Sequence, residues 1–190
     1  MATNDMAALA DIKSYLNIAD DLSDGLLALL ITAMSTLVQN FCDDPFLQAS
    51  YDWITNGWGS QAMPIPYGPV QTITSVTVDG HQVPQRPRPG ACGWIYDPDG
   101  QQVLLSGFQF CPGVGNVEIY YTAGYADQAA LPMDLQFAIW KLVGLKFKEP
   151  GHLDKTSETN RGATTVAYLR AWAPEDVVQL LARYQRRAAG

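Results

Sequence analysis

The sequence is poor in the residues from which catalytic and metal-binding sites are built. Of its two histidines, His81 directly follows an Asp-Gly turn and His152 lies in a polar stretch, so neither has the setting of a general base in a dry cleft. No serine, cysteine or threonine occupies a nucleophile-elbow pattern. The glycines Gly113 and Gly115 lead into a strand pattern, whereas a phosphate site needs a helix there. We therefore expect no enzyme, no catalytic residue, no metal site and no cofactor.

Cysteines are also few. The three, Cys42, Cys92 and Cys111, are far apart and odd in number. A disulfide framework or a zinc site needs pairs at close spacing, so we expect reduced, half-buried thiols in a protein made in the cytosol.

Long uncharged apolar runs are missing as well. No run reaches the length of about 18 apolar residues that a membrane span needs, and no basic segment precedes an apolar core near residue 1. We expect neither a transmembrane span nor a signal peptide, and no membrane partner.

Positive charge is scarce over most of the chain. Residues 1–140 contain three basic and fourteen acidic residues, a net charge of −11, whereas residues 141–190 contain nine basic and five acidic residues, a net charge of +4. Proteins that grip nucleic acid need Lys and Arg clustered on the body to neutralise phosphates. The acidic body is therefore suited to repelling DNA, or it simply keeps the domain soluble.

The residues that are present begin with two helical patterns. Apolar residues at i, i+3 and i+7 predict a short helix at about 8–17. A longer helix at about 22–42 starts among carboxylates, which suit a helix N-terminus, and ends at Asp43-Asp44-Pro45. Its apolar stripe is wide and consists of Leu22, Leu26, Leu27, Leu30, Met34, Leu37, Val38 and Phe41. Helices this apolar must pack against something.

Between about 50 and 122 the apolar period changes to two, which predicts strands. Asp79-Gly80 indicates a hairpin turn, the three prolines within 63–70 indicate an edge or a connector, and the change of phase at Ile73 indicates a bulge. The clearest strand has Val117, Ile119 and Tyr121 on one face. We expect a small antiparallel β unit of five or six strands.

The stretch after that strand is interpreted as a structural joint. Gly124 lets the chain turn out of the strand, and Pro132 occupies the first turn of a helix at 132–148. This helix is apolar nearly all round, so it is either deeply buried or shared with neighbouring subunits. The pattern leaves both readings open.

The C-terminal part differs in character. Residues 151–165 contain almost nothing to bury, which predicts a flexible arm, and Pro174 opens an amphipathic helix at about 174–188. A short amphipathic helix after a polar linker typically docks on another protein. The alternative is that it folds back onto its own domain.

Together these patterns predict an α+β fold, mainly a helical bundle with a small antiparallel β-sheet insertion and a C-terminal arm ending in a helix. The expected domains are a core at 1–149 and, at 150–190, the flexible arm with its docking helix.

Three stretches within about 8–148 carry a resemblance by their order and spacing. They are "LADIKSYLNI" with "DDLSDGLLALLITAMSTLVQNF", then "MPIPYGPVQTITSVTVDG", then "YTAGY" followed by "LPMDLQFAIWKLV". In this order they resemble the head–tail connector (head-completion or adaptor) proteins of tailed bacteriophages.

The resemblance implies a structural, non-catalytic virion protein, made in the host bacterial cytoplasm and located at the head–tail interface. It implies a homo-oligomeric, dodecameric ring below the portal, extending the channel through which double-stranded DNA passes without specific binding. The implied partners are the portal protein on one side and a tail, stopper or nozzle protein on the other.

Two sets of residues carry the predicted contacts. Those expected at the ring interface are Phe137, Trp140, Leu145 and Phe147. Those expected to bind the portal are Trp172, Val177, Leu181, Arg183, Tyr184, Arg186 and Arg187.

Two other functions stay open. One is a tail-side or baseplate ring component of a phage. The other is a carbohydrate-binding β module that stacks sugars on an exposed Trp58 or Trp94.

Overall fold

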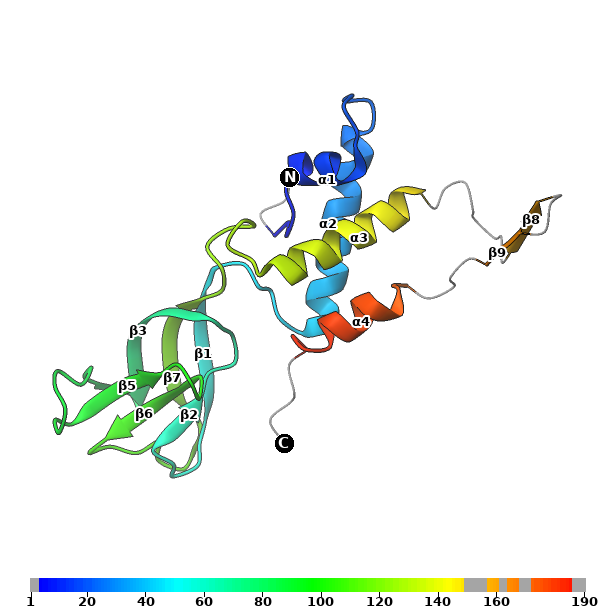
Figure 1. The fold of residues 1–190 in the computed structure, drawn as a ribbon. Coiled ribbons are helices and arrows are strands. Elements are labelled where there is room, and N and C mark those ends of the chain that lie inside the picture. The colour runs from blue at the N-terminus through cyan, green and yellow to red at the C-terminus, as the bar shows by residue number, and fades with distance from the viewer. Residues whose placement is uncertain (1–3, 149–156, 161–163, 168–171, 186–190) are drawn as a thin grey trace. The chain divides into compact units, whose positions relative to one another are not determined.

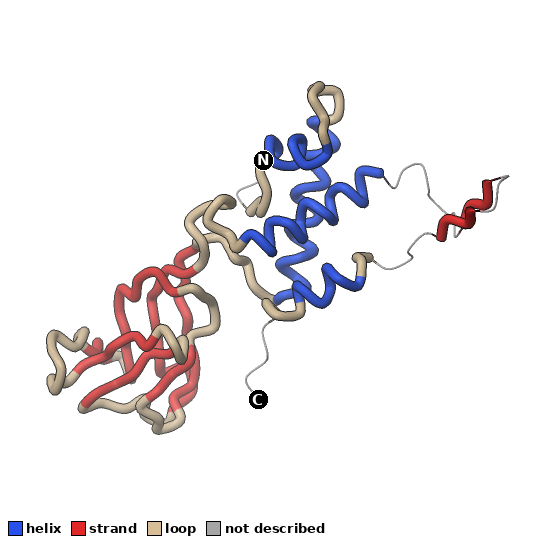
Figure 2. Tube along the Cα trace, viewed as in Figure 1, coloured by secondary structure: helices blue, strands red, loops and turns tan. Residues whose placement is uncertain are grey.

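The chain divides into two units in a computed structural model that describes residues 4–148, 157–160, 164–167 and 172–185. The helical unit combines the described parts of Met1–Pro45 and Asp127–Gly190, and the β unit is the continuous segment Phe46–Ala126. Figure 1 shows the elements of each unit, and Figure 2 shows which segments are helices, strands and loops. The β unit is thus an insertion between the two parts of the helical unit.

The helical unit contains α1 (Leu9–Leu16), α2 (Asp24–Cys42), α3 (Met133–Lys148) and α4 (Glu175–Leu181). Within it α3 crosses α2, with α1 packed towards one end of α3 and α4 along the other side (Figure 1). The core that these helices share is closed to solvent and includes Ile12, Leu27, Ile31, Val38, Leu135, Ile139, Leu142, Val177 and Leu181. Because these side chains come from all four helices, the burial of each helix depends on the others.

Helix ends are set by local backbone geometry. Asn17 after α1 and Asp43 after α2 both adopt the left-handed conformation, with φ of 57° and 54°. The Asn17 and Asp43 backbone N–H groups then donate to carbonyls of the preceding turn. Such a residue closes a helix by satisfying carbonyls that have no partner within it.

By length and composition, α2 is the one helix among those described that is apolar enough to cross a membrane. Its inner side nevertheless packs against α1, α3 and α4, and Leu27, Ile31 and Val38 have no exposed surface. We interpret α2 as the core helix of the helical unit.

The β unit contains two antiparallel sheets. The four-stranded sheet has the order β1 (Ala49–Gly57), β7 (Gly113–Ala123), β3 (Val70–Val78), β4 (His81–Val83). The three-stranded sheet has the order β2 (Ala62–Pro64), β6 (Gln102–Ser106), β5 (Gly93–Asp97). Side chains of both sheets meet in one hydrophobic core, formed by Met63, Ile65, Val76, Val78, Val83, Trp94, Val103, Leu105, Phe110, Val117, Ile119, Tyr121 and Ala123.

Strand β7 is the centre of this unit because β1 and β3 pair with its two edges. Val117, Ile119 and Tyr121 are buried on one face, as the sequence predicts. The register between β3 and β7 shifts between Ile73 and Ser75, which confirms the irregularity expected at Ile73.

The α+β class is confirmed, but the prediction of a mainly helical bundle is wrong, because strands are as frequent as helices. The periodic strands of 46–126 bury enough apolar surface to build a core of their own. Sequence patterns located the strands but did not show that the two sheets form a hydrophobic core separate from the helices.

Two further strands, β8 (Ser157–Asn160) and β9 (Thr164–Ala167), form an antiparallel pair. They lie in the segment expected to be a flexible arm; the rest of that segment, 149–156, 161–163 and 168–171, is outside the described residues. Helix α4 covers the first half of the helix expected at 174–188.

The joint that the sequence suggested has a definite geometry at Gly124. Its φ is +106°, and a Cβ built there would lie 2.6 Å from the carbonyl carbon and oxygen of Leu47. The Gly124 N–H donates to the Pro69 carbonyl at 2.9 Å. At the other side of the joint, the Pro132 carbonyl accepts the first backbone bond of α3, from the Gln136 N–H at 3.1 Å.

We predict that Gly124→Ala destabilises the β unit more than Gly80→Ala does. Gly80 also has a positive φ, +76°, but nothing lies within 4 Å of its added Cβ. Gly80→Ala therefore carries only the left-handed penalty of about 1–2 kcal/mol. Gly124→Ala adds the overlap with Leu47, which costs roughly another 1–3 kcal/mol. Chemical denaturation of both variants measures the difference, and equal losses would show that the contact with Leu47 relaxes freely.

Candidate functional site

The outer side of α3 is the first candidate surface. The inner side, with Leu135, Ile139 and Leu142, is buried in the helical unit, whereas Phe137 and Leu145 are 46% and 43% exposed. Trp140 and Phe147 are half-buried at the edges of that outer side. The two readings left open for this helix therefore apply to different sides: one side is buried within the unit and the other is open. The assignment of Phe137, Trp140, Leu145 and Phe147 to a ring interface stays a prediction.

Helix α1 extends this surface with an aromatic ring. The Tyr15 ring meets Phe137 edge-on, with centroids 6.1 Å apart and planes at 86°, and lies 6.0 Å from the Trp140 ring. The close approach depends on Gly144, whose added Cβ would lie 3.1 Å from Leu16 Cδ2. We call the partly or fully exposed apolar residues Tyr15, Met133, Phe137, Trp140 and Leu145 together the α1–α3 face.

A second apolar surface begins in the turn before α2 and continues on that helix. Leu22, in the turn, and Leu26 and Leu29, on α2, follow one another at spacings of four and three and are 93%, 46% and 72% exposed. We call these three leucines the α2 stripe. Leu29 is outside the apolar stripe that the sequence indicated, and Leu22 and Leu26 were taken as part of the buried one. The signal for this surface was that apolar residues of 22–42 spread over more of the helix than one face.

Charges border the α2 stripe at its N-terminal end. Lys13 Nζ contacts a carboxylate oxygen of Asp21 at 2.6 Å and one of Asp24 at 2.8 Å. The hydrogen bond from Lys13 holds the pKa of Asp21 below its ordinary value, while the Asp21 and Asp24 carboxylates raise the pKa of Lys13. Asp20 is exposed beside this group, and its carboxylate accepts the Leu22 N–H at 3.1 Å.

Helix α4 is folded onto its own unit. Val177 and Leu181 are buried, the Trp172 ring lies 5.1 Å from the Phe41 ring, and the Cys42 thiol donates to the Leu181 carbonyl at 3.7 Å. Burial raises the pKa of the Cys42 thiol to about 12. The helix therefore uses its apolar stripe within the chain, which is the alternative that the sequence left open.

Polar contacts hold the same helix in place. The Tyr184 hydroxyl donates to the Asp134 carboxylate at 2.7 Å. Lys141 pairs with Asp176, and its hydrogen bond lowers the pKa of that carboxyl. Arg183 is exposed, while Arg186 and Arg187 lie outside the described residues. The portal-binding role of this segment stays a prediction. With Val177 and Leu181 buried, it requires either the outer side of α4 or the release of the helix.

The β unit offers one of its two candidate tryptophans to solvent. Trp94 is 5% exposed in the core, so it is not available for stacking on a sugar, whereas Trp58 is 56% exposed. Two other exposed apolar residues are close to Trp58 in sequence or in strand pairing. Ile54 is on β1, which ends at Gly57, and Val114 on β7 follows Gly113, the residue that pairs with Gly57.

The outer face of the four-stranded sheet is polar and acidic. Tyr120 lies opposite Asp52 in the β1–β7 register and beside Glu118. Its hydrogen bonds with the Glu118 and Asp52 carboxylates raise the pKa of Tyr120 to about 12. This face suits neither phosphates nor other anions.

Within the described ranges, no group of three or more His, Cys, Asp or Glu side chains is arranged to hold a metal ion. Cys42, Cys92 and Cys111 are free thiols, buried, exposed and intermediate in that order. Among the described residues, the candidate sites are therefore the exposed apolar surfaces, the α1–α3 face and the α2 stripe.

Comparisons with known proteins agree on one class. The family model described as "Head completion protein" matches residues 5–187. The fold is similar to a chain of the "Neck of empty GTA particle computed with C6 symmetry", at 22% identity and a TM-score of 0.62, covering 100% of this chain and 95% of that one. A chain of the "Neck of native GTA particle computed with C12 symmetry" matches at 21% identity and 0.60, with the same coverage. No curated protein matches the sequence.

A third similar chain, at 22% identity and a TM-score of 0.60, comes from the "Virion of native gene transfer agent (GTA) particle". It again covers 100% of this chain and 95% of that chain. At these identities the likeness to the solved structures concerns the fold.

We predict that the Cys42 thiol reports whether α4 is seated. With Cys92 and Cys111 replaced by Ser, a maleimide at pH 8 should leave Cys42 unmodified in the folded chain, because the thiol is buried and its pKa is about 12. Leu181→Ala removes a fully buried side chain above it and costs about 2–5 kcal/mol, so local opening and the labelling rate should rise more than tenfold. The exposed Gln179→Ala is the matched control on α4. Labelling of the parent chain as fast as in urea would contradict this seating.

Proposed function

The chain belongs to the head completion protein family, and from this membership we propose that it forms a homo-oligomeric ring of twelve copies below the portal. Its role is structural: it connects the head of the virion to the tail at the head–tail interface. The ring extends the channel through which the genome leaves the head.

The exposed outer side of α3 is the observation that carries the ring. Phe137, Leu145 and Met133 are large apolar side chains left open on a helix whose other side is fully buried. Several large apolar side chains exposed on one helix favour a contact with another protein. The neck structures with similar folds were computed with C6 and C12 symmetry, which supports repeated copies around an axis.

The charge distribution supports passage of DNA without binding. Net charge over 1–140 is −11, and the outer face of the four-stranded sheet carries Asp52 and Glu118. An acidic wall repels phosphates, so DNA slides along it without the counterion release that drives binding. The family description, a head completion protein, supports a structural role for the chain.

The proposed partners are the portal protein on one side and a tail, stopper or nozzle protein on the other. The segment proposed to reach the portal, 150–190, contains six basic and four acidic residues, a net charge of +2, in contrast to the acidic body. Arg183, in the turn directly after α4, is a basic residue of this segment that the structure describes, and it is exposed.

We predict that virions contain about twelve copies of the chain in the neck. Quantitative mass spectrometry of purified particles measures the number of copies per particle. Cryo-electron microscopy of particles with a tagged chain shows where in the particle the chain lies. Particles assembled without the chain should be filled heads that lack tails, because the chain is the proposed link between the portal and the tail side. One or two copies per particle would contradict the ring, and a tag at the far end of the tail would favour a baseplate component.

A further inference from the structure

We propose that the α2 stripe of one copy packs on the α1–α3 face of the next copy, with α2 and α3 antiparallel across the contact. The inference rests on the ring proposed above and names the surfaces that build it.

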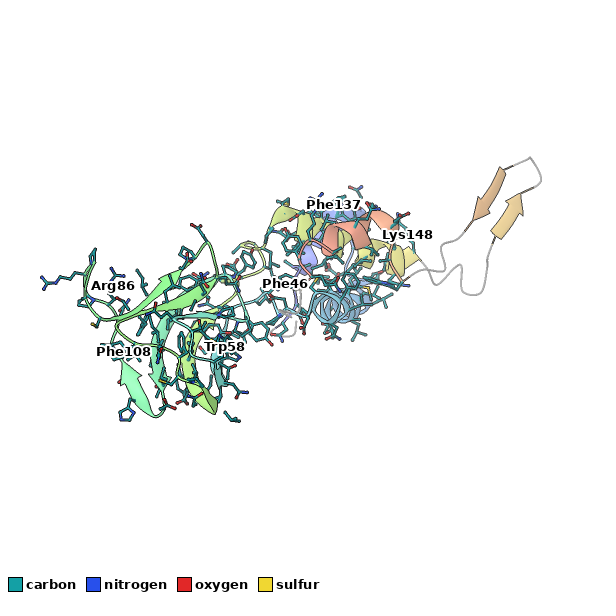
Figure 3. All side chains as sticks on the ribbon, turned by 90° about the horizontal axis from the view of Figure 1, so that it is seen from below. Phe46, Trp58, Arg86, Phe108, Phe137 and Lys148 are labelled. Atoms are coloured by element: carbon teal, nitrogen blue, oxygen red, sulfur yellow. The ribbon has the colours of Figure 1, made fainter. Side chains whose placement is uncertain are left out.

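The first argument is that the two surfaces are different and come from different elements of the helical unit. In Figure 3, Phe137 is labelled on the side of the helical unit away from the pale-blue coil of α2. A closed dimer needs only one self-complementary surface, whereas a ring of many copies needs two different surfaces that fit each other. The described helical unit offers such a pair, the α2 stripe and the α1–α3 face.

The second argument is that the two surfaces match in kind and span similar stretches of sequence. The α2 stripe covers seven residues, from Leu22 in the turn before α2 to Leu29 on the helix, and Phe137 and Leu145 are eight residues apart on α3. At 1.5 Å per residue, Phe137 and Leu145 are about 12 Å apart along the helix. Branched leucines then meet an aromatic surface on a neighbouring helix, which is how ridges of one helix fill the grooves of another.

The third argument is charge, and it sets the direction. Asp20 and Asp21 are exposed at the N-terminal end of the α2 stripe, and Lys148 is exposed at the C-terminal end of the α1–α3 face, one turn beyond Leu145. An antiparallel contact brings the acids to Lys148 and also opposes the two helix dipoles. A parallel contact would instead bring Asp20 towards Asp134 in the first turn of α3. Charge complementarity therefore favours a second copy, in the antiparallel direction.

Antiparallel packing pairs Leu29 with Phe137 and Leu22 with Leu145. We therefore use disulfide trapping in assembled virions, in a chain with Cys92→Ser and Cys111→Ser, where Cys42 is buried. The test variant carries Leu29→Cys with Phe137→Cys. The matched control carries Leu29→Cys with Leu145→Cys, a pair that only a parallel contact would bring together. Each single-cysteine variant is a further control.

On oxidation, the test variant should give a ladder of covalent oligomers on a non-reducing gel, while both single variants and the control pair stay monomeric. Dimers from a single variant would show a self-complementary contact and overturn the proposal. A ladder from the control pair would overturn the antiparallel direction. Protection of both cysteines without any ladder would show that a different virion protein covers these surfaces.

Counting the copies in the same virions separates this inference from the ring itself. About twelve copies per virion without a ladder on the gel would exclude the proposed interface but not the ring. One or two copies per virion would exclude both.

A charge exchange covers the case in which the cysteine variants fail to enter particles. Asp20→Lys and Lys148→Glu should each lower incorporation several-fold, and the double variant should restore it. A double variant that is worse than either single variant would refute the contact.

Discussion

The packing of α3 against α2 is the contact on which the helical unit depends. The two helices come from parts of the chain separated by the whole β unit, yet their inner sides share one core through Ile31, Leu135 and Ile139. Helices α1 and α4 complete that core. With the inner sides buried in this way, the outer sides of α2 and α3 are left open for contacts between subunits.

The outer sides of α2 and α3 must meet two opposing requirements. Assembly needs exposed leucine and aromatic side chains, whereas a subunit that waits in solution needs to avoid uncontrolled association. The net charge of −7 opposes such association, because like-charged subunits repel until surfaces of opposite charge are aligned. An acidic composition thus suits both a subunit free in solution and the proposed wall of a DNA channel.

Sequence periodicity located helices and strands, and it identified Val117, Ile119 and Tyr121 as one buried face. It did not separate Trp58 from Trp94, because exposure of a tryptophan depends on which sheet covers it. It also placed Val177 and Leu181 on an apolar stripe without showing that α2 and α3 of the same chain fill it. An apolar stripe in the sequence indicates that this side of the helix is buried against something. Which helix or subunit buries it depends on the tertiary structure. The α2 stripe escaped notice for the same reason, since Leu22 and Leu26 match a core pattern as well as a contact surface.

The division of the helical unit into two chain segments has a consequence for biosynthesis. About ninety residues separate the end of α2 at Cys42 from the start of α3 at Met133. At roughly 5–20 residues per second, α2 leaves the ribosome on the order of 5–20 s before its main packing partner exists. The core of the β unit can form once its central strand β7 has emerged, shortly before α3, while the leucines of α2 stay uncovered until α3 follows. A nascent chain of this design is therefore a natural client for holding chaperones until α3 emerges.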